Sequence, residues 1–513
     1  MLIAHRVIDR IARNALQAFG APGLSVALAA GSDVTCRAYG VADLSTGEAV
    51  TPETAFTLAS ATKSFTALAL SILREEGALD WDDPVSGLAR DLCAGRREGA
   101  APLTVRDLLS HQTGFGWHDP LWYNSPWSRA AVIRKAWKTG PDQPPRSGFQ
   151  YCNVTYMLAG EIVSRVSGKS YEEFVRSRIL GPLGLRSAHF SGEEALRRGA
   201  LARPHVRVNG SVRPIEWPDV SKANAACGLR INAPDLAAWM SQFFQPRATG
   251  IPVRAFEGIT APQVTIGPGA GDRFYTLFGQ PDWLEYGFGW FLRRYRGHRV
   301  IFHTGRLPGA ASHVAVLPDL GFGIAAMTNL TLACLAETVT LTVLDRMLGG
   351  PETDWLGYYT GVSKELERAA APPVVADGPE SASAIADAVR CVGDYTAGAY
   401  GRIRVRESGG GLRFAWARYR GDLMPMGGMR FSLRNLGCAL LPEGELVEFQ
   451  EGGAVVSFLG RRFERVVRAE DGEERGSGAG DRMWVRSRLR AGRGGGDLVR
   501  GRAVRAGGLS AER

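Results

Sequence analysis

The hydrophobic pattern of the chain begins with a helical repeat and changes quickly to short apolar runs. Apolar residues recur at helical spacing from Ile3 to Phe19. Two apolar runs follow, Gly23–Ala30 and Val34–Val41, and the polar turn Gly31-Ser32-Asp33 separates them. This pattern predicts an N-terminal helix followed by two neighbouring strands.

Helical patterns dominate the middle of the chain, and strand-like runs return after it. Gly and Pro separate apolar helices near 60–73, 105–110, 129–138, 154–166 and 171–180. Strand-like runs follow at 287–295, 299–303, 312–317 and 323–328, before a helix over 335–348. Strands at both ends with helices between them favour one α/β domain whose sheet joins sequence-distant segments. We expect this domain to occupy residues 1–350.

The pattern changes again after a stretch rich in Ala, Pro and small polar residues at 369–383. From about 392 to 467, apolar and polar residues alternate, and Gly-rich turns separate the runs. This alternation predicts a small antiparallel barrel or sandwich. We therefore expect a helix and linker over 351–390, the small β domain over 391–468, and an Arg/Gly-rich disordered tail over 469–513.

Composition and charge narrow the range of functions. The 513 residues are 45% hydrophobic and 22% charged, which excludes a chain that is disordered as a whole. The net charge is +9, and much of it lies in 481–513, where nine Arg face three acids. This tail has Trp484 as its lone aromatic residue, so we expect a solvated extension and not a nucleic-acid partner.

Cysteine usage and the N-terminus bear on the cellular location. Seven dispersed Cys without a C-x-x-C motif favour reduced thiols and disfavour a zinc cluster. Charged residues interrupt the apolar pattern of the first 21 residues, and no stretch approaches the roughly 20 apolar residues of a membrane span. His111, His118 and Asp119 can be drawn as a metal site, but their loop context disfavours it. We expect a cytoplasmic protein without membrane contact, metal or cofactor.

The first candidate for chemistry is Ser60-Ala61-Thr62-Lys63, which opens an apolar helix. The three-residue spacing puts Ser60 and Lys63 on the same helical face. A serine hydroxyl is a poor nucleophile until a base removes its proton, and a desolvated Lys can do so. The alternative is an N-cap Ser beside an unrelated surface Lys. Of the six Lys, however, Lys63 alone follows a Ser by three positions.

The second candidate is Tyr151-Cys152-Asn153, at the start of the predicted helix near 154–166. Asn153 suits a helix N-cap, and Tyr151 suits a core position, so a structural role explains both residues. The functional alternative is a Tyr that shuttles a proton and an Asn that orients the substrate or a Lys.

Two tripeptides compete for a third element. Lys138-Thr139-Gly140 ends an amphipathic helix, and its Gly with the following Pro141 is typical of a helix stop. His303-Thr304-Gly305 instead follows a predicted strand and leads through a Pro-Gly turn into another. A strand edge suits an element that aligns the substrate, so we take His303 and reject Lys138.

Ser-x-x-Lys, Tyr-x-Asn and His-x-Gly, in this order, resemble the motifs of the class C β-lactamase and penicillin-binding-protein-like serine hydrolases. The resemblance covers about residues 8–348, and 393–463 is similar to the lipocalin-like domain that follows in some members. It implies an α/β β-lactamase-like fold: an antiparallel sheet flanked by helices, plus a mainly helical subdomain. A small antiparallel β-barrel domain would follow. Tyr-Cys-Asn and the His of the third motif fit the esterase, D-peptidase and transferase branches better than true β-lactamases.

The resemblance also implies a two-step acyl-enzyme mechanism without a cofactor. Lys63, aided by Tyr151, would deprotonate Ser60 for attack on a carbonyl, and Asn153 would orient the substrate. His303 would polarise the substrate or support Tyr151. The resemblance further assigns two groups of residues: an oxyanion hole from backbone N–H groups of Ser60 and Arg306, and substrate binding by Thr304 and Gly305.

The acyl acceptor decides the reaction, and the motifs do not identify it. Water would make the protein a hydrolase of an ester or of an amide or peptide bond in a small or peptidic substrate. An amine would make it a penicillin-binding-protein-type thioesterase and peptide cyclase, which releases a nonribosomal peptide held as a thioester on a carrier protein. The second alternative is an inactive binding protein on the same scaffold, which the presence of all three motifs disfavours.

Overall fold

The structure is a computed structural model. It describes residues 4–94, 102–198, 201–208, 210–246, 249–267, 283–331, 334–370, 390–409, 411–426, 428–434 and 445–466. The expected tail over 469–513 and the linker residues 371–389 lie outside these ranges. Among the helices of the described ranges, none has the length and apolar character that a membrane crossing requires.

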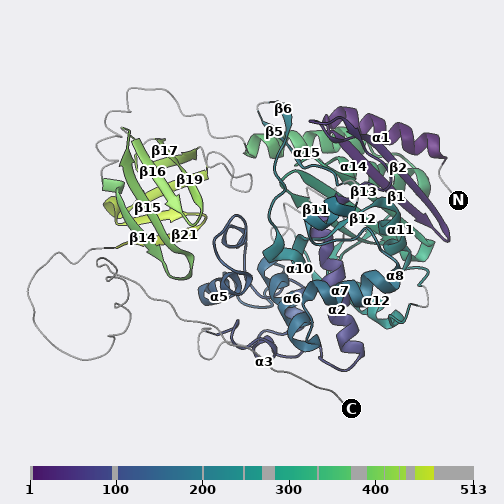
Figure 1. Ribbon diagram of the computed structural model, residues 1–513, viewed down its shortest axis with the longest axis horizontal. Coiled ribbons are helices and arrows are strands. Elements are labelled where there is room, and N and C mark those ends of the chain that lie inside the picture. The colour runs from purple at the N-terminus through teal and green to yellow at the C-terminus, as the bar shows by residue number, and fades with distance from the viewer. Residues whose placement is uncertain are drawn as a thin grey trace, which may run out of the picture. The chain divides into compact units, whose positions relative to one another are not determined.

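Nine strands of the described residues form one antiparallel sheet in the order β3-β2-β1-β13-β12-β11-β10-β9-β8 (Figure 1). They are β1 (Gly23–Ala30), β2 (Asp33–Asp43), β3 (Glu48–Ala49), β8 (Val264–Thr265), β9 (Leu284–Tyr286), β10 (Phe291–Tyr295), β11 (His298–Leu307), β12 (Ala310–Leu317) and β13 (Phe322–Thr328). Leu24 of β1 lies opposite Thr328 of β13. The sheet therefore joins the two ends of the domain, and the expected α/β fold is confirmed.

Helices cover both faces of this sheet, which explains why its central strands are almost continuously apolar. The helices α1 (His5–Phe19), α14 (Leu335–Leu348) and α15 (Trp355–Ala370) share a core with Leu24, Val26 and Leu28 of β1. The alternate residues Ala27 and Ala29 belong to the core of the opposite face, with α2 (Lys63–Glu75) and α11 (Ala233–Ser241).

A mainly helical region is inserted between β3 and β8. Its helices are α2, α3 (Val85–Leu88), α4 (Val105–Leu109), α5 (Arg129–Thr139), α6 (Asn153–Ser167), α7 (Tyr171–Val175), α8 (Gly181–Leu183), α9 (Gly192–Arg198), α10 (Asn224–Cys227), α11 and α12 (Val253–Thr260). Short strands pair within it: β4 (Phe56–Thr57) with β7 (Arg230–Ile231), and β5 (His205–Val208) with β6 (Ser211–Pro214). Figure 1 shows α2, α6, α7 and α12 together, and α2 contacts the other three.

The ends of the helices and strands mostly lie where the sequence predicts them, with two differences. Gly140 ends α5 at φ 79°, as expected for a helix stop. Within the predicted strand over 287–295, β10 accounts for 291–295, and 287–290 is a turn that joins it to β9. The predicted helix over 171–180 is α7 followed by a π-helical turn at Arg176–Leu180.

The alternating segment folds into a closed barrel and not a sandwich. Its eight described strands are β14 (Gly393–Ala397), β15 (Gly401–Ser408), β16 (Gly411–Trp416), β17 (Tyr419–Pro425), β18 (Arg430–Arg434), β19 (Glu445–Gln450), β20 (Val455–Phe458) and β21 (Arg461–Arg465). Pairing of Tyr395 in β14 with Arg465 in β21 closes it. Alternate positions such as Ile403, Val405 and Phe414 are buried, as a barrel interior requires.

Candidate active site

Ser60 lies in a strained turn at the start of α2. The 3₁₀ turn Ala59–Thr62 runs directly into α2. Ala59, the residue before Ser60, has φ 50°, which a residue with a β-carbon adopts only when its surroundings impose it. Ser60 itself is half-buried, so its hydroxyl can be reached from outside. The turn thus presents one serine at a helix N-terminus.

Lys63 lies entirely below the surface and contacts Ser60. Its Nζ donates to Ser60 Oγ at 3.2 Å, to Asn153 Oδ1 at 2.7 Å and to the carbonyl of Ala226 at 3.0 Å. Burial lowers the pKa of Lys63 to about 8, while the charge of Asp119 acts in the opposite direction. A lysine in this state has an appreciable neutral fraction near neutral pH, which a general base needs.

Two glycines let other backbone segments pack against this turn. A β-carbon on Gly305 of β11 would lie 2.1 Å from the carbonyl oxygen of Leu58. A β-carbon on Gly289, which has φ 72°, would lie 2.6 Å from the carbonyl oxygen of Lys63. Both distances are too short for any side chain. The glycine of the His-x-Gly motif therefore sets the position of β11 against the serine turn.

Tyr151 lies beside both residues of the first motif. The Lys63 Nζ is 4.7 Å from the centre of the Tyr151 ring, and the ring hydroxyl is hydrogen-bonded to Ser60. Burial raises the pKa of Tyr151 well above its usual range, and the hydrogen bond to Ser60 only partly opposes this. The phenol is therefore protonated at neutral pH and can donate a proton.

Asn153 is the first residue of α6, and its side chain does not cap the helix. Its Nδ2 donates to both carboxylate oxygens of Asp119, at 3.0 and 2.9 Å, and its Oδ1 accepts from Lys63. The structural alternative of an N-cap is thus wrong, because Cys152 holds that position. The sequence offered Asp119 only as a metal ligand, and its contact with Asn153 gave no sequence signal.

His303 lies near Tyr151 but is neutral. Its Nδ1 is 2.6 Å from the carbonyl of Thr304, and its Nε2 is 3.2 Å from the hydroxyl of Tyr286. Burial, reinforced by the positive charge of Lys63, lowers the pKa of His303 to about 3. The ring centres of His303 and Tyr151 are 6.4 Å apart. His303 can therefore position Tyr286 and Tyr151 but offers no positive charge at neutral pH.

Beyond Phe302, one edge of β11 faces the turn that holds Ser60. β10 pairs with β11 only as far as Phe302, and beyond it β11 contacts the turn that holds Ser60. Side chains alternate along a strand, so Thr304 and Arg306 face away from Gly305. Arg306 Nη2 accordingly donates to Glu337 of α14 at 2.6 Å. The roles expected of Thr304 and Arg306 thus rest on their backbone groups.

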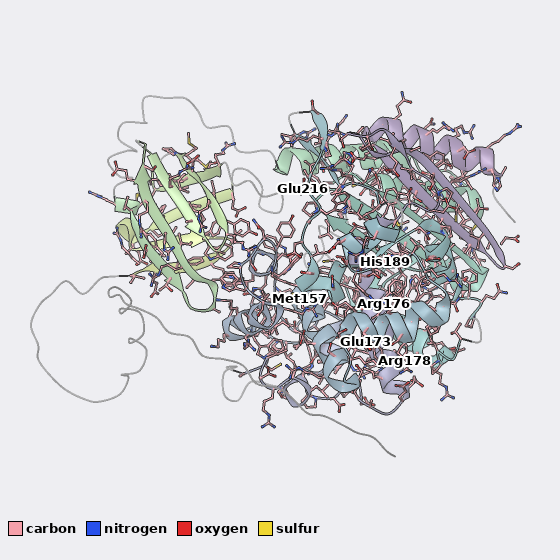
Figure 2. All side chains as sticks on the ribbon, viewed as in Figure 1. Met157, Glu173, Arg176, Arg178, His189 and Glu216 are labelled. Carbon is pink, nitrogen blue, oxygen red and sulfur yellow. The ribbon has the colours of Figure 1, made fainter. Side chains whose placement is uncertain are left out.

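The remaining sequence candidates are Lys138 and the histidines of the drawn metal site, and the His111 ring centre lies 4.3 Å from that of Tyr151. Lys138 is exposed in the last turn of α5. His111 Nδ1 accepts from the backbone N–H of Cys152 at 3.2 Å. In the described ranges, no group of three or more His, Cys, Asp or Glu is placed to hold a metal ion. Met157, labelled in Figure 2, follows Asn153 by one turn of α6, and its buried side chain belongs to the core beneath the helix.

The arrangement suits acyl transfer. An accessible hydroxyl contacts a desolvated amine and a protonated phenol, so a base and an acid both lie within reach of one nucleophile. The structure brings Ser60, Lys63, Tyr151 and Asn153 into direct contact. Their catalytic roles stay predictions, to be tested below.

Comparison with known proteins gives the same family as the resemblance of the sequence motifs. A family profile described as Beta-lactamase matches residues 8–334. An unguisins hydrolase of Aspergillus campestris is 28% identical over 379 residues, which cover 70% of this chain and 69% of that protein. Penicillin-binding protein 4 of Amycolatopsis lactamdurans is 28% identical over 317 residues, covering 60% of this chain and 81% of that protein.

Solved structures extend the likeness to the fold. The D-amino acid amidase of Ochrobactrum anthropi SV3 aligns with a TM-score of 0.54 at 25% identity, covering 71% of this chain and 97% of that chain. An octameric penicillin-binding protein homologue of Pyrococcus abyssi aligns with a TM-score of 0.57 at 20% identity, covering 90% of this chain and 100% of that chain. The second likeness shows the fold alone. The chain therefore belongs to the β-lactamase family and is a serine hydrolase or acyltransferase.

Proposed function

We propose that this protein hydrolyses an amide bond of a small or peptidic substrate through an acyl-Ser60 intermediate. The contact of the buried Lys63 amine with the accessible Ser60 hydroxyl carries this proposal. Relatives named amidase and hydrolase support an amide as the bond that is cleaved. The same residues would also cleave ester bonds, because an ester has a less basic leaving group than an amide.

The first half of the reaction acylates Ser60. Neutral Lys63 accepts the proton of the Ser60 hydroxyl as Oγ attacks the substrate carbonyl carbon. The N–H groups of Ser60 and Arg306 donate to the developing oxyanion. Tyr151 gives its proton to the leaving nitrogen as the carbon–nitrogen bond breaks, and protonated Lys63 restores the phenol. Asn153 orients the substrate and Lys63 relative to each other.

The second half returns the enzyme to its starting state. Water attacks the acyl carbon as neutral Lys63 accepts its proton, with the Tyr151 phenol as relay, and Ser60 Oγ leaves and takes a proton back from Lys63. An amine could replace water, and this would give the peptide-cyclase reaction with its carrier-bound thioester substrate. That alternative stays a prediction.

The experiment combines intact-mass measurement with a matched serine control. A p-nitrophenyl ester of an N-acetylated amino acid should leave an acyl group on Ser60, and Ser60→Ala should remove both adduct and turnover. Ser64→Ala is the control, because Ser64 is buried in α2 and donates to the carbonyl of Ala61 at 2.8 Å. Full turnover by Ser60→Ala would refute the mechanism, whereas the absence of both adduct and turnover in the wild type would favour the alternative of an inactive binding protein.

A peptide thioester with a free amine separates the two acceptors. A hydrolase releases the free acid whether the amine is free or acetylated. A cyclase releases a product that is lighter by one water than this acid, and only from the free amine. Predominant cyclic product would replace the hydrolase proposal with the cyclase.

A further inference from the structure

The segment 116–123, called here the 116–123 loop, is held by residues of the C-terminal barrel. His118 Nδ1 lies 2.5 Å from the hydroxyl of Tyr400, which precedes β15. The hydroxyl of Tyr419 in β17 donates to the carbonyl of Tyr123 at 2.8 Å. All four of these residues are buried. The loop is thus fixed to the barrel near its middle and at its end.

A third contact fixes the beginning of the loop. Arg461 of β21 donates through both terminal nitrogens to the carboxylate of Asp142, at 2.6 and 2.9 Å. The same carboxylate accepts from the backbone N–H of Gly116 at 3.2 Å. The guanidinium of Arg461 also lies 5.3 Å from the centre of the Tyr400 ring. Barrel residues therefore hold the loop at three points: His118 and Tyr123 directly, and Gly116 through Asp142.

The carboxylate of Asp119, within this loop, is directed at Asn153. It accepts from the indole N–H of Trp122 at 2.8 Å and from the Asn153 amide nitrogen with both oxygens. An amide side chain has two orientations that exchange its oxygen and nitrogen. A carboxylate on one side accepts only, and the Lys63 ammonium on the other donates only. The pair therefore selects the orientation in which Asn153 Oδ1 faces Lys63.

We propose that the barrel positions Asn153 against Lys63 through the 116–123 loop, with Asp119 as the positioning residue and Tyr400 as the barrel group that holds it. The inference rests on the proposed function, because it concerns the rate at which Ser60 is acylated. Without Asp119, the reversed amide would turn its N–H groups toward Lys63 and displace the amine from Ser60. A displacement of about 1 Å in such a site costs on the order of 100-fold in rate.

Asp119 also affects the charge state of Lys63. Its negative charge raises the pKa of Lys63 against the effect of burial. The other titratable groups near the amine do not supply a negative charge in place of that of Asp119. These groups are the thiols of Cys152 and Cys227, the phenols of Tyr151 and Tyr156, and the imidazoles of His111 and His303. Loss of the Asp119 charge therefore moves the pH midpoint of acylation downward.

The test measures single-turnover acylation of Ser60 by an activated ester across the pH range. Asp119→Asn should lower the rate constant by about 100-fold and the pH midpoint by about one unit. Tyr400→Phe removes one oxygen atom and should lower the rate constant by about 3- to 10-fold, with KM changed less than twofold. Both variants together should be no slower than Asp119→Asn alone, because they act through one path.

Tyr395→Phe is the matched control. Its hydroxyl donates within the barrel, to the carbonyls of Cys391 at 2.8 Å and Gly453 at 3.1 Å. This variant should lower the melting temperature and leave the rate constant and its pH midpoint unchanged. A rate loss equal to that of Tyr400→Phe would show a general effect of barrel stability and overturn the proposal.

The other outcomes also decide the matter. Wild-type acylation by Asp119→Asn overturns the positioning role, and wild-type acylation by Tyr400→Phe overturns the role of the barrel. Multiplicative losses in the double variant overturn their coupling. If Asp119→Asn fails to fold, Tyr400→Phe decides alone. Absence of any acyl-Ser60 in the wild-type enzyme instead refutes the proposed function, which is a different result from normal acylation by the variants.

Discussion

The interior beneath Ser60 and the interior of the barrel are both lined with aromatic rings, but their polar content differs. Beneath Ser60, a buried lysine lies against the Tyr151 ring and a buried carboxylate binds Asn153. Among the described residues of the barrel, no Asp, Glu, Lys, Arg or His is buried. There Trp416 stacks on Tyr419 with ring centres 5.6 Å apart.

The difference separates residues that serve stability from residues that serve chemistry. Burying aromatic surface stabilises the folded state, whereas burying a charge destabilises it unless partners compensate. A protein retains a desolvated amine where its altered basicity is useful. Substitutions in the barrel interior should therefore change stability, and substitutions beneath Ser60 should change rate. The 116–123 loop connects the two regions, since it contacts the barrel through Tyr400 and carries Asp119 to Asn153.

The largest expected effect is that of Lys63→Met. Methionine fills a similar volume but offers no base, so single-turnover acylation should fall about a thousandfold or more. Relief of the desolvated charge offsets the three lost hydrogen bonds, so the free energy of unfolding should change by less than about 2 kcal/mol. Stopped-flow acylation and urea denaturation measure the two quantities. Acylation retained by Lys63→Met would contradict the view that residues beneath Ser60 serve chemistry and residues of the barrel interior serve stability.

Phe414→Ala should show the opposite behaviour. Phe414 is 1% exposed in β16, with the Phe458 ring centre 4.9 Å away. Its loss should lower the free energy of unfolding by about 3–5 kcal/mol through lost burial and a cavity. The acylation rate of the folded fraction, counted by active-site titration, should equal that of the wild type. A slower rate would mean that barrel packing reaches Ser60 more broadly than through Tyr400.

Gly305→Ala tests the close packing of β11 against the turn that holds Ser60. The added methyl group would meet the Leu58 carbonyl at 2.1 Å and push β11 away from the serine turn, so kcat should fall about 100-fold. Gly411→Ala in β16 is the matched control, because a β-carbon there meets nothing within 4 Å. Equal kcat values for the two variants in a steady-state assay would contradict the close approach.

His303→Ala should have a smaller effect, and Lys138→Ala none. His303 contributes packing and one hydrogen bond to Tyr286, so we expect about a tenfold loss of kcat/KM. Lys138 is exposed in α5. The two variants, assayed with one activated ester, rank in this order if the third motif is His303-Thr304-Gly305. The reverse ranking would restore Lys138-Thr139-Gly140 as the third motif.

The smallest effect is a pH dependence of the wild type. Lys63 accepts a proton only when neutral, so the acylation rate should rise with pH and level off above a midpoint near its pKa of about 8. Below this midpoint, each pH unit lowers the rate about tenfold. With a pKa of about 3, His303 should give no step between pH 5 and 8. A single step near pH 6.5 would identify a histidine as the base instead.

Local features of the fold were predictable because they depend on neighbours in sequence. Ser60 and Lys63 share a face since one helical turn joins them, and the apolar run Gly23–Ala30 is β1 to the residue. Gly140 stops α5 because the residue must adopt φ 79° there. The alternation after residue 392 indicated an antiparallel β domain but left barrel and sandwich open, since closure depends on the pairing of β14 with β21.

The sequence by itself determined which residue types are available for chemistry, and the tertiary structure decided how they act. The pKa of Lys63, the neutral state of His303 and the protonated Tyr151 follow from burial, which involves elements far apart in the chain. The contact of Asp119 with Asn153 arises only when the 116–123 loop lies against α6. Burial and such long-range contacts have no signature in local periodicity, because they depend on which surfaces meet after folding.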